Sequence, residues 1–216
     1  LTKDHYFGRT LDMECSYNEK VIVTPKNYNL KFRLSNNLSN HHAIIGIGTV
    51  VDNYPLYYDA TNEKGLSMAG LYFPGNAVYL PINRNTDNVA PFEFIPWVLS
   101  QCENIAQVKS LLTRVNLADI PYSASYPQSP LHWIISDREN SVVIEPRKNG
   151  MEIFDNPIGV LTNNPPFPMQ MFNLNNYLSI STNPPHNNFS EKISLNIDEL
   201  QDNSLPIVYR RNNLYY

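Results

Sequence analysis

The sequence has few cysteines, no long apolar run and no excess of basic residues. Cys15 and Cys102 are its only cysteines, and without a C-x-x-C pairing they predict neither a disulfide framework nor a zinc site. A formal net charge of −4 argues against nucleic acid, which needs clustered Lys and Arg. The longest strongly apolar run, residues 43–51, is too short to span a bilayer. We therefore expect a soluble, cytoplasmic protein with a small-molecule partner and no membrane association.

A chain of 216 residues predicts a single α+β domain. Apolar runs bounded by turn residues predict strands on either side of a helical pair. The early strands are expected at residues 20–24, 42–51, 55–59 and 66–73, the helices at 92–101 and 104–114, and the later strands at 132–136, 141–145, 151–154 and 159–162. Asn104 and Gln107 have the spacing of a capping box for the second helix. Short connections favour antiparallel strands, and the order of elements favours two sheets with helices on the outer faces.

Familiar catalytic motifs are weak here. Residues 65–70 (GLSMAG) resemble a nucleophile elbow with one residue too many, and a core strand is the better interpretation. Gly46 and Gly48 lack the third glycine and the helix of a dinucleotide site, so we interpret them as part of a closely packed strand. His41 and His42 belong to no metal-ligand spacing. The sequence therefore predicts no metal and no cofactor.

The segment 6–12 (YFGRTLD) is more informative, because Arg9 precedes Asp12 by three residues. On spacing alone this is an exposed ion pair, which contributes little. The segment continues, however, into MECSYNE and VTPKNY, and an ordered set of further motifs follows along most of the chain. These are YPLYYD (54–59), NEKGL (62–66), AGL (69–71), FEFIPW (92–97), LHW (131–133) and GVLTN (159–163). As an ordered set they resemble the choloylglycine hydrolase and penicillin V acylase family of N-terminal-nucleophile hydrolases.

That resemblance implies an αββα sandwich and an N-terminal cysteine that attacks an amide carbonyl, with its own α-amino group as base. An α-amino pKa of about 8 suits that role. By resemblance, Arg9 lowers the pKa of the thiol and Asp12 orients the amine. Asn163 supplies a side-chain donor to the oxyanion, and Tyr72 supplies a backbone N–H. The alternatives without a catalytic role are a turn-forming Asn163 and a strand-packing Tyr72.

Two departures from the family pattern affect the expected activity. The cysteine of the family would precede Leu1, and neither Cys15 nor Cys102 has the terminal amine that the mechanism needs. We therefore expect the chain as printed to lack amidase activity. The second departure is an internal deletion that we hypothesise after residue 192. We expect residues 1–192 to form the family domain and residues 193–216 to be a divergent tail that resembles the carboxy end of the family.

The resemblance leaves three functions open. The first is deconjugation of glycine- or taurine-linked bile salts, and the second is hydrolysis of penicillin V. Tyr at position 72 is usual in penicillin V acylases, whereas Asn is usual in many bile salt hydrolases, although the other motifs are closer to the bile-salt enzymes. The third is a non-catalytic protein, either the inactive product of a decayed gene or a domain that keeps the pocket and binds amphipathic ligands without cleaving them. The resemblance implies that full-length members can form homo-oligomers, which we do not expect of this chain.

Overall fold

The structure is a computed structural model that describes residues 4–177. Its main element is a seven-stranded sheet in which every neighbouring pair is antiparallel. The strands, in spatial order, are β1 (Lys20–Thr24), β2 (Ile44–Val51), β3 (Tyr54–Asn62), β4 (Ser67–Tyr72), β7 (Leu131–Ser136), β8 (Ser141–Arg147) and β9 (Gly150–Asp155). The antiparallel strands predicted on both sides of the helical pair thus belong to one sheet.

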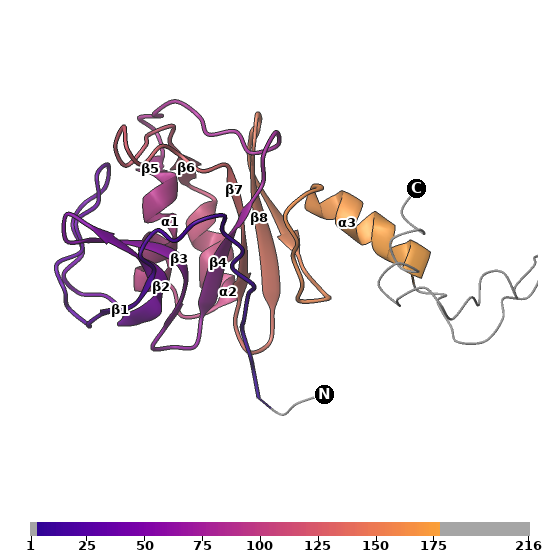
Figure 1. Ribbon diagram of the computed structural model, residues 1–216, viewed down its shortest axis with the longest axis horizontal. Coiled ribbons are helices and arrows are strands. Elements are labelled where there is room, and N and C mark those ends of the chain that lie inside the picture. Colours follow the sequence, from indigo (N-terminus) through magenta and orange to yellow (C-terminus); the bar gives the residue numbers. More distant parts are fainter. Residues whose placement is uncertain (1–3, 178–216) are drawn as a thin grey trace, which may run out of the picture. The chain divides into compact units, whose positions relative to one another are not determined.

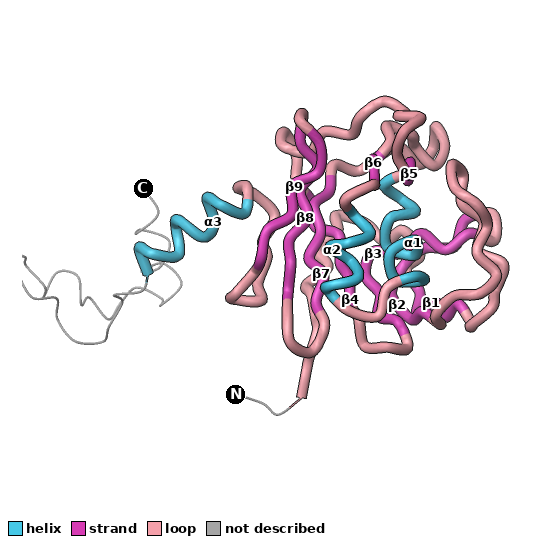
Figure 2. Tube along the Cα trace, turned by 180° about the vertical axis from the view of Figure 1, so that it is seen from behind, coloured by secondary structure: helices cyan, strands magenta, loops and turns pink. Residues whose placement is uncertain are grey.

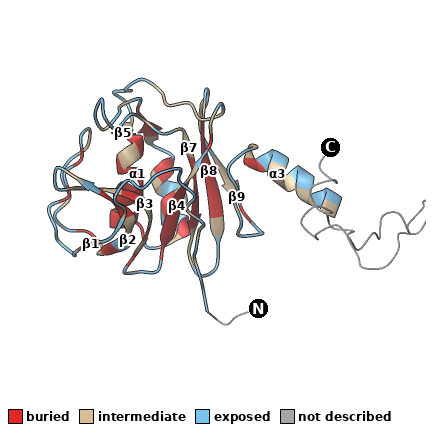
Figure 3. Cartoon of the chain, in the orientation of Figure 1, coloured by how far each residue is buried: buried red, intermediate tan, exposed pale blue. Residues whose placement is uncertain are grey.

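One face of this sheet carries the helices (Figures 1 and 2). A short 3-10 helix η1 (Pro91–Glu93) leads into α1 (Phe94–Gln101), which packs on β3 and β4, and α2 (Ile105–Leu112) follows. Buried residues concentrate in α1 and in the strands beneath it (Figure 3). The core between them includes Met68, Phe94, Leu99, Trp133 and Ile144. Burial of this apolar surface is the main force that holds the helices to the sheet.

The predicted capping box at the start of α2 is confirmed in part. The Asn104 side chain accepts a hydrogen bond from the backbone N–H of Gln107 at 3.0 Å, which satisfies one free donor of the first turn. The Gln107 side chain reaches back to the N–H of Glu103 at 2.8 Å, one residue before the N-cap. Two side chains, those of Asn104 and Gln107, therefore fix the backbone at the N-terminus of α2.

Two details of the predicted elements differ from the structure. The helix predicted at 104–114 ends at Leu112, and Val115 soon begins β6 (Val115–Leu117), which pairs in parallel with β5 (Asp87–Val89). Residues 159–162 form no strand. Gly159 has a φ of 66°, and the segment bonds instead to side chains: Val160 O accepts from Asn156, and Thr162 N–H donates to Gln170. These side chains replace the ladder partners that a strand would need.

Residues 4–177 supply one helix layer and one sheet of the predicted αββα sandwich. The chain divides into two compact units, the first ending at Gln170 within α3 (Phe167–Leu174). The described part of the second unit comprises the end of α3 and the 3-10 helix η2 (Asn175–Tyr177). The predicted tail 193–216 lies outside the described residues. In the described part, no helix has the length and apolarity needed to cross a membrane.

Close approach of β2 to β3 explains the glycines at positions 46 and 48, as expected for a closely packed strand. A Cβ at Gly46 would lie 2.1 Å from the Asp59 carbonyl oxygen and 2.6 Å from Ala60 Cα. We expect Gly46→Ala to lower the free energy of unfolding by about 2–3 kcal/mol, because backbone atoms must move to admit the methyl group. Urea denaturation measures this loss. Gly8→Ala is the control, since a Cβ there meets no atom within 4 Å, and an equal loss in both variants would contradict the explanation.

Candidate active site

The N-terminal segment crosses the face of the sheet that the helices leave open (Figures 1 and 2). His5 Nε2 lies 3.1 Å from the Ser136 hydroxyl of β7, and Thr49 of β2 donates to the carbonyl of Tyr17 at 3.0 Å. Arg9 lies between these two attachments and bonds to β3 and β4. The segment thus runs across β7, β4, β3 and β2 in turn, which places Arg9 over the middle of the sheet.

Arg9 occupies the point where β3 and β4 stop pairing. Their ladder ends at the pair Asp59 and Ala69, and the register of β3 against β2 shifts beside Tyr58. Such bulges detach backbone groups from a ladder. Arg9 Nη1 donates to the carbonyl of Tyr58 at 3.2 Å and to that of Gly70 at 2.8 Å. The guanidinium of Arg9 therefore joins β3 and β4 just beyond the last residue pair of their ladder.

The charge partner of Arg9 is Asp59, with 4.0 Å between Nε and Oδ2, and both side chains are 19% exposed. Burial lowers the pKa of the Arg9 guanidinium, while the charge of Asp59 opposes this shift. Burial also raises the pKa of Asp59, against the stabilising charge of Arg9 and a hydrogen bond from the Ile47 backbone. Arginine nevertheless remains protonated in proteins. The site therefore holds a fixed positive charge.

Asp12, which by resemblance orients the amine of the family's N-terminal cysteine, is exposed, and within residues 4–177 no hydrogen bond or ion pair joins it to Arg9. The charge partner of Arg9 is Asp59 instead. Asp59 is the last residue of the YPLYYD motif, and neither that motif nor the resemblance indicated a role for it. Asp59 lies close to Arg9 because of the register shift in β3, which cannot be predicted from any residue pattern in the sequence.

The backbone N–H of Tyr72 points toward the same separation between strands. Tyr72 pairs with Leu131 of β7, yet it is the next residue, Phe73, whose N–H donates to Pro130 O at 2.8 Å. Because successive N–H groups of a strand point to opposite sides, the Tyr72 N–H is directed away from β7 and toward β3. Gly70, two residues earlier, faces the same way and bonds to Arg9. Tyr72 as a whole is 55% exposed.

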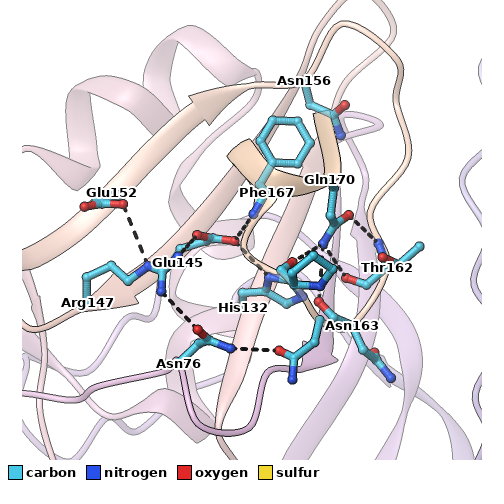
Figure 4. A network of polar contacts seen from close by, with 12 residues as sticks. Asn76, His132, Glu145, Arg147, Glu152, Asn156, Thr162, Asn163, Phe167 and Gln170 are labelled. Atoms are coloured by element: carbon cyan, nitrogen blue, oxygen red, sulfur yellow. Dashed lines mark hydrogen bonds and ion pairs between the residues drawn. The ribbon is translucent and has the colours of Figure 1, made fainter. Parts of the chain in front are cut away.

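Asn163 lies in an exposed turn that the side chain of Gln170 organises (Figure 4). The Gln170 amide donates to the carbonyls of Pro165 at 2.6 Å, Thr162 at 3.3 Å and Asn163 at 3.4 Å. Its oxygen accepts from Thr162 N–H at 3.2 Å. A single side chain therefore fixes the backbone of the turn, while the side chain of Asn163 remains exposed.

The neighbouring residue, Asn164, ties this turn to the segment that follows Tyr72. Its amide nitrogen donates to Pro74 O at 3.2 Å, and its oxygen accepts from Asn76 at 3.0 Å. The structure thus brings the turn of Asn163 to the end of β4, the strand that Arg9 also contacts. Arg9 and Asn163 are 154 positions apart in the sequence. Both are linked to the same stretch of chain, because Arg9 bonds to Gly70 of β4 and the turn of Asn163 bonds to Pro74 just after β4.

A buried polar network lies next to this junction (Figure 4). Glu145 of β8 is fully buried, and its Oε1 accepts from the N–H of Phe167 at 2.7 Å and lies 3.4 Å from His132 Nδ1. Its Oε2 accepts from Arg147 Nη2 at 2.7 Å. Burial by itself would raise the pKa of Glu145, but the hydrogen bonds from His132 and Phe167 and the charge of Arg147 outweigh it and hold the pKa below the ordinary value. His132 belongs to the LHW motif, but no pattern in the sequence predicted the network around Glu145.

The lowered pKa of Glu145 predicts a pH-dependent contribution to stability. Ionised Glu145 stabilises the fold above its ordinary pKa of 4.5, and this contribution is lost as the pH falls through the lower pKa of the folded state. We expect Glu145→Gln to be less stable than the unmodified chain near neutral pH, and the difference to narrow between about pH 5 and pH 2. Urea denaturation across this range measures it, with Glu152→Gln as the exposed control. A constant difference at every pH would contradict the prediction.

The two cysteines lie in different surroundings. Cys102, the C-cap residue of α1, is buried, and burial raises the pKa of its thiol to about 11, so it is poorly suited to act as a nucleophile. Cys15 is exposed in the N-terminal segment. Among residues 4–177, no three His, Cys, Asp or Glu side chains are arranged to hold a metal ion.

Comparison with known proteins agrees with this geometry. The family model of linear amide C–N hydrolases, choloylglycine hydrolase family, matches residues 2–198. The chain is 52% identical over 192 residues to a bile salt hydrolase/transferase of Lactiplantibacillus plantarum, covering 89% of this chain and 59% of that protein. It is 42% identical over 184 residues to a conjugated bile acid hydrolase of Lactobacillus gasseri, covering 84% of this chain and 57% of that one.

Solved structures show the same fold. A cysteine-to-alanine mutant of conjugated bile acid hydrolase from Clostridium perfringens superposes with a TM-score of 0.75 at 38% identity, covering 81% of this chain and 54% of that one. Penicillin V acylase from Agrobacterium tumefaciens superposes with a TM-score of 0.65 at 16% identity, covering 80% and 53% of the two chains, and at that identity it shows the fold alone.

The chain therefore belongs to the choloylglycine hydrolase family of linear amide C–N hydrolases. Its sheet and helices are those of the N-terminal-nucleophile hydrolase fold, as predicted. The chain spans a little over half the length of the curated relatives, at 59% and 57% of the two named above.

Proposed function

We propose that this chain forms the part of an amide hydrolase that binds the scissile amide, and that its substrates are glycine- or taurine-conjugated bile salts. In the reaction, water is consumed and the C–N bond is cleaved to give a free bile acid and the amino acid. The observation that carries the proposal is the position of Arg9. It joins β3 to β4 by bonding the carbonyls of Tyr58 and Gly70, and Gly70 lies two residues before Tyr72 on the strand whose end holds the turn of Asn163.

Each group has a chemical role in this proposal. Attack on an amide carbonyl creates an oxyanion, which needs hydrogen-bond donors fixed in advance. The Tyr72 N–H and the Asn163 side-chain amide are the two donors. Arg9 supplies positive charge that favours the thiolate of a nearby nucleophile, as charged neighbours do for cysteine. Asp12 is retained as a partner for the attacking amine, although within the described residues it is exposed and unbonded.

The names of the relatives support the choice of bile salts as substrates. The two matched above are described as a bile salt hydrolase/transferase and a conjugated bile acid hydrolase. The oligomeric state of the protein and its location in the cell remain expectations, with a homo-oligomer not expected for this chain and a cytoplasmic location inferred from the sequence.

A chimera tests the proposed function directly. Residues 4–177 replace the matching segment of the Lactiplantibacillus plantarum relative, which supplies the remaining parts of the enzyme. We expect the chimera to release glycine from glycocholate and taurine from taurocholate, and to lose this activity on Arg9→Met. A folded chimera without activity on either conjugate would overturn the proposal. The chain as printed, tested in parallel, is expected to bind the conjugates without cleaving them.

Penicillin V is a second candidate substrate because of Tyr72, which is 55% exposed at the end of β4. An exposed aromatic ring there offers a stacking surface to the phenoxy group of penicillin V. We expect Tyr72→Asn in the chimera to lower kcat/KM for penicillin V relative to glycocholate by about tenfold, the equivalent of losing one aromatic contact. Release of 6-aminopenicillanic acid and of glycine measures the two rates. An unchanged ratio would remove Tyr72 from substrate selection.

A further inference from the structure

Glu145 is a buried charge whose position the packing of the sheet does not explain. Its neighbours along β8, Val142, Val143 and Ile144, are apolar and buried, and Glu145 itself has no exposed surface. Burial of a carboxylate costs several kcal/mol unless donors surround it. An apolar side chain would satisfy the packing at lower cost. The carboxylate is therefore better explained by the groups that it holds.

Those groups belong to three separate segments. The N–H of Phe167 is one of the free donors at the start of α3, and the Glu145 carboxylate accepts it at 2.7 Å. His132 of β7 contacts the same oxygen at 3.4 Å, and its ring stacks on Phe73 with 4.1 Å between centroids. Glu145 thereby fixes Phe167, which lies four positions after Asn163. Through His132 it also fixes Phe73, the residue directly after Tyr72.

Arg147 extends the network to the turn of Asn163. It bonds to Glu145 at 2.7 Å, lies 5.1 Å from the centre of the Phe73 ring, and reaches the oxygen of Asn76 at 3.5 Å. Asn76 donates in turn to Asn164 at 3.0 Å. Both segments that carry the proposed oxyanion donors are thus attached to the same buried carboxylate, by two routes each. Figure 4 shows the polar contacts among these residues.

We propose that Glu145 is a positioning residue that sets the spacing between the Tyr72 N–H and the side chain of Asn163. The proposal rests on the proposed function of these two donors. Glu145 itself makes no contact with either donor group. It acts through Phe167, through His132 and Phe73, and through Arg147 and Asn76.

Hydrogen exchange of the chain as printed, read by mass spectrometry without ligand, tests this role. In Glu145→Gln, a single oxygen must serve both Phe167 and Arg147, so one attachment is lost. We expect exchange in residues 162–170 and 73–76 to accelerate by about tenfold or more, while residues 44–62 of β2 and β3 keep their protection. The matched control is Glu152→Gln, which removes the exposed partner of Arg147 at 3.8 Å and should leave both segments unchanged.

Three outcomes would overturn the positioning role. These are unchanged exchange in residues 162–170, equal acceleration in every strand, and the same local effect in Glu152→Gln. If Glu145→Gln does not fold, Arg147→Lys provides the second variant, because it keeps a cation beside Glu145 but cannot span to Asn76. Arg147→Lys should accelerate exchange in residues 73–76 and 162–165 but leave the exchange of the Phe167 N–H unchanged. Equal acceleration at Phe167 and in those two segments would overturn the proposal.

The readout separates this inference from the proposed function. Exchange without ligand reports only how firmly the two segments are held. Glycocholate hydrolysis by the chimera carrying the same variants reports whether the spacing matters, and we expect Glu145→Gln to lower kcat about tenfold relative to Glu152→Gln with KM little changed. Failure of the unmodified chimera to hydrolyse any conjugated bile salt contradicts the proposed function. A kcat that is equal in the two variants contradicts the positioning role alone.

Discussion

Asn163→Ala is expected to lower kcat for glycocholate hydrolysis in the chimera by about 10²- to 10³-fold, the usual cost of losing one oxyanion donor. The fold should tolerate the change. The Asn163 side chain is exposed. The turn is held by the Gln170 side chain, which bonds to the backbone of the turn, and by the side chain of Asn164. We therefore expect the free energy of unfolding to change by less than about 0.5 kcal/mol, as for most surface substitutions.

The control for this variant is Asn37→Ala, which removes an exposed asparagine from a loop outside the site. It should leave both kcat and stability unchanged. KM should also change little in Asn163→Ala, because an oxyanion donor acts mainly in the transition state. A fall of less than about threefold in kcat, or a rise in KM with kcat unchanged, would contradict the assignment of Asn163 as an oxyanion donor.

Arg9→Met is expected to lower the free energy of unfolding by about 2–4 kcal/mol, since it removes a charged donor from a mostly buried site. The carbonyls of Tyr58 and Gly70 lose their hydrogen bonds, and Asp59 loses its charge partner. The same change should abolish hydrolysis in the chimera. Urea denaturation of the chain as printed measures the stability, and glycine release measures the activity.

Arg84→Met is the matched control, because Arg84 is exposed in a loop and its loss should change neither quantity. Arg9→Lys gives a finer test. Lysine keeps the charge, but its single nitrogen cannot replace both Nη1, which bonds the two carbonyls, and Nε, which faces Asp59, so it should recover only part of the lost stability. A loss below about 0.5 kcal/mol in Arg9→Met would show that the junction of β3 and β4 does not depend on Arg9.

Much of the fold could be predicted from the sequence because its signals are local. The strand β1 was predicted with the same bounds as observed, and the start of α2 was marked by Asn104 and Gln107. Residues 159–162 were misread because their apolar alternation resembles a strand, whereas their backbone groups bond to Asn156 and Gln170 instead. The side-chain partners of a loop cannot be read from periodicity.

The candidate site was less predictable, because its contacts connect distant segments. Arg9, Tyr72 and Asn163 were named by resemblance to a family, and no spacing in the sequence would have joined them. Asp59 and Glu145 were not named. The first reaches Arg9 through a register shift in β3, and the second acts from inside the sheet. A charged residue within an apolar strand such as VVIEP is nevertheless a signal of a buried polar contact that sequence reasoning could use.

The central claim is that Arg9, the end of β4 and the turn of Asn163 surround one binding site for a conjugated bile salt. Hydrogen exchange of the chain as printed, with and without saturating glycocholate, tests it most directly. We predict slower exchange in three segments together, residues 5–12, 71–76 and 160–167, and no change in α2. Protection confined to another region, such as the groove lined by Ile22, Pro25, Val50 and Pro55, or no protection in any segment, would contradict the claim.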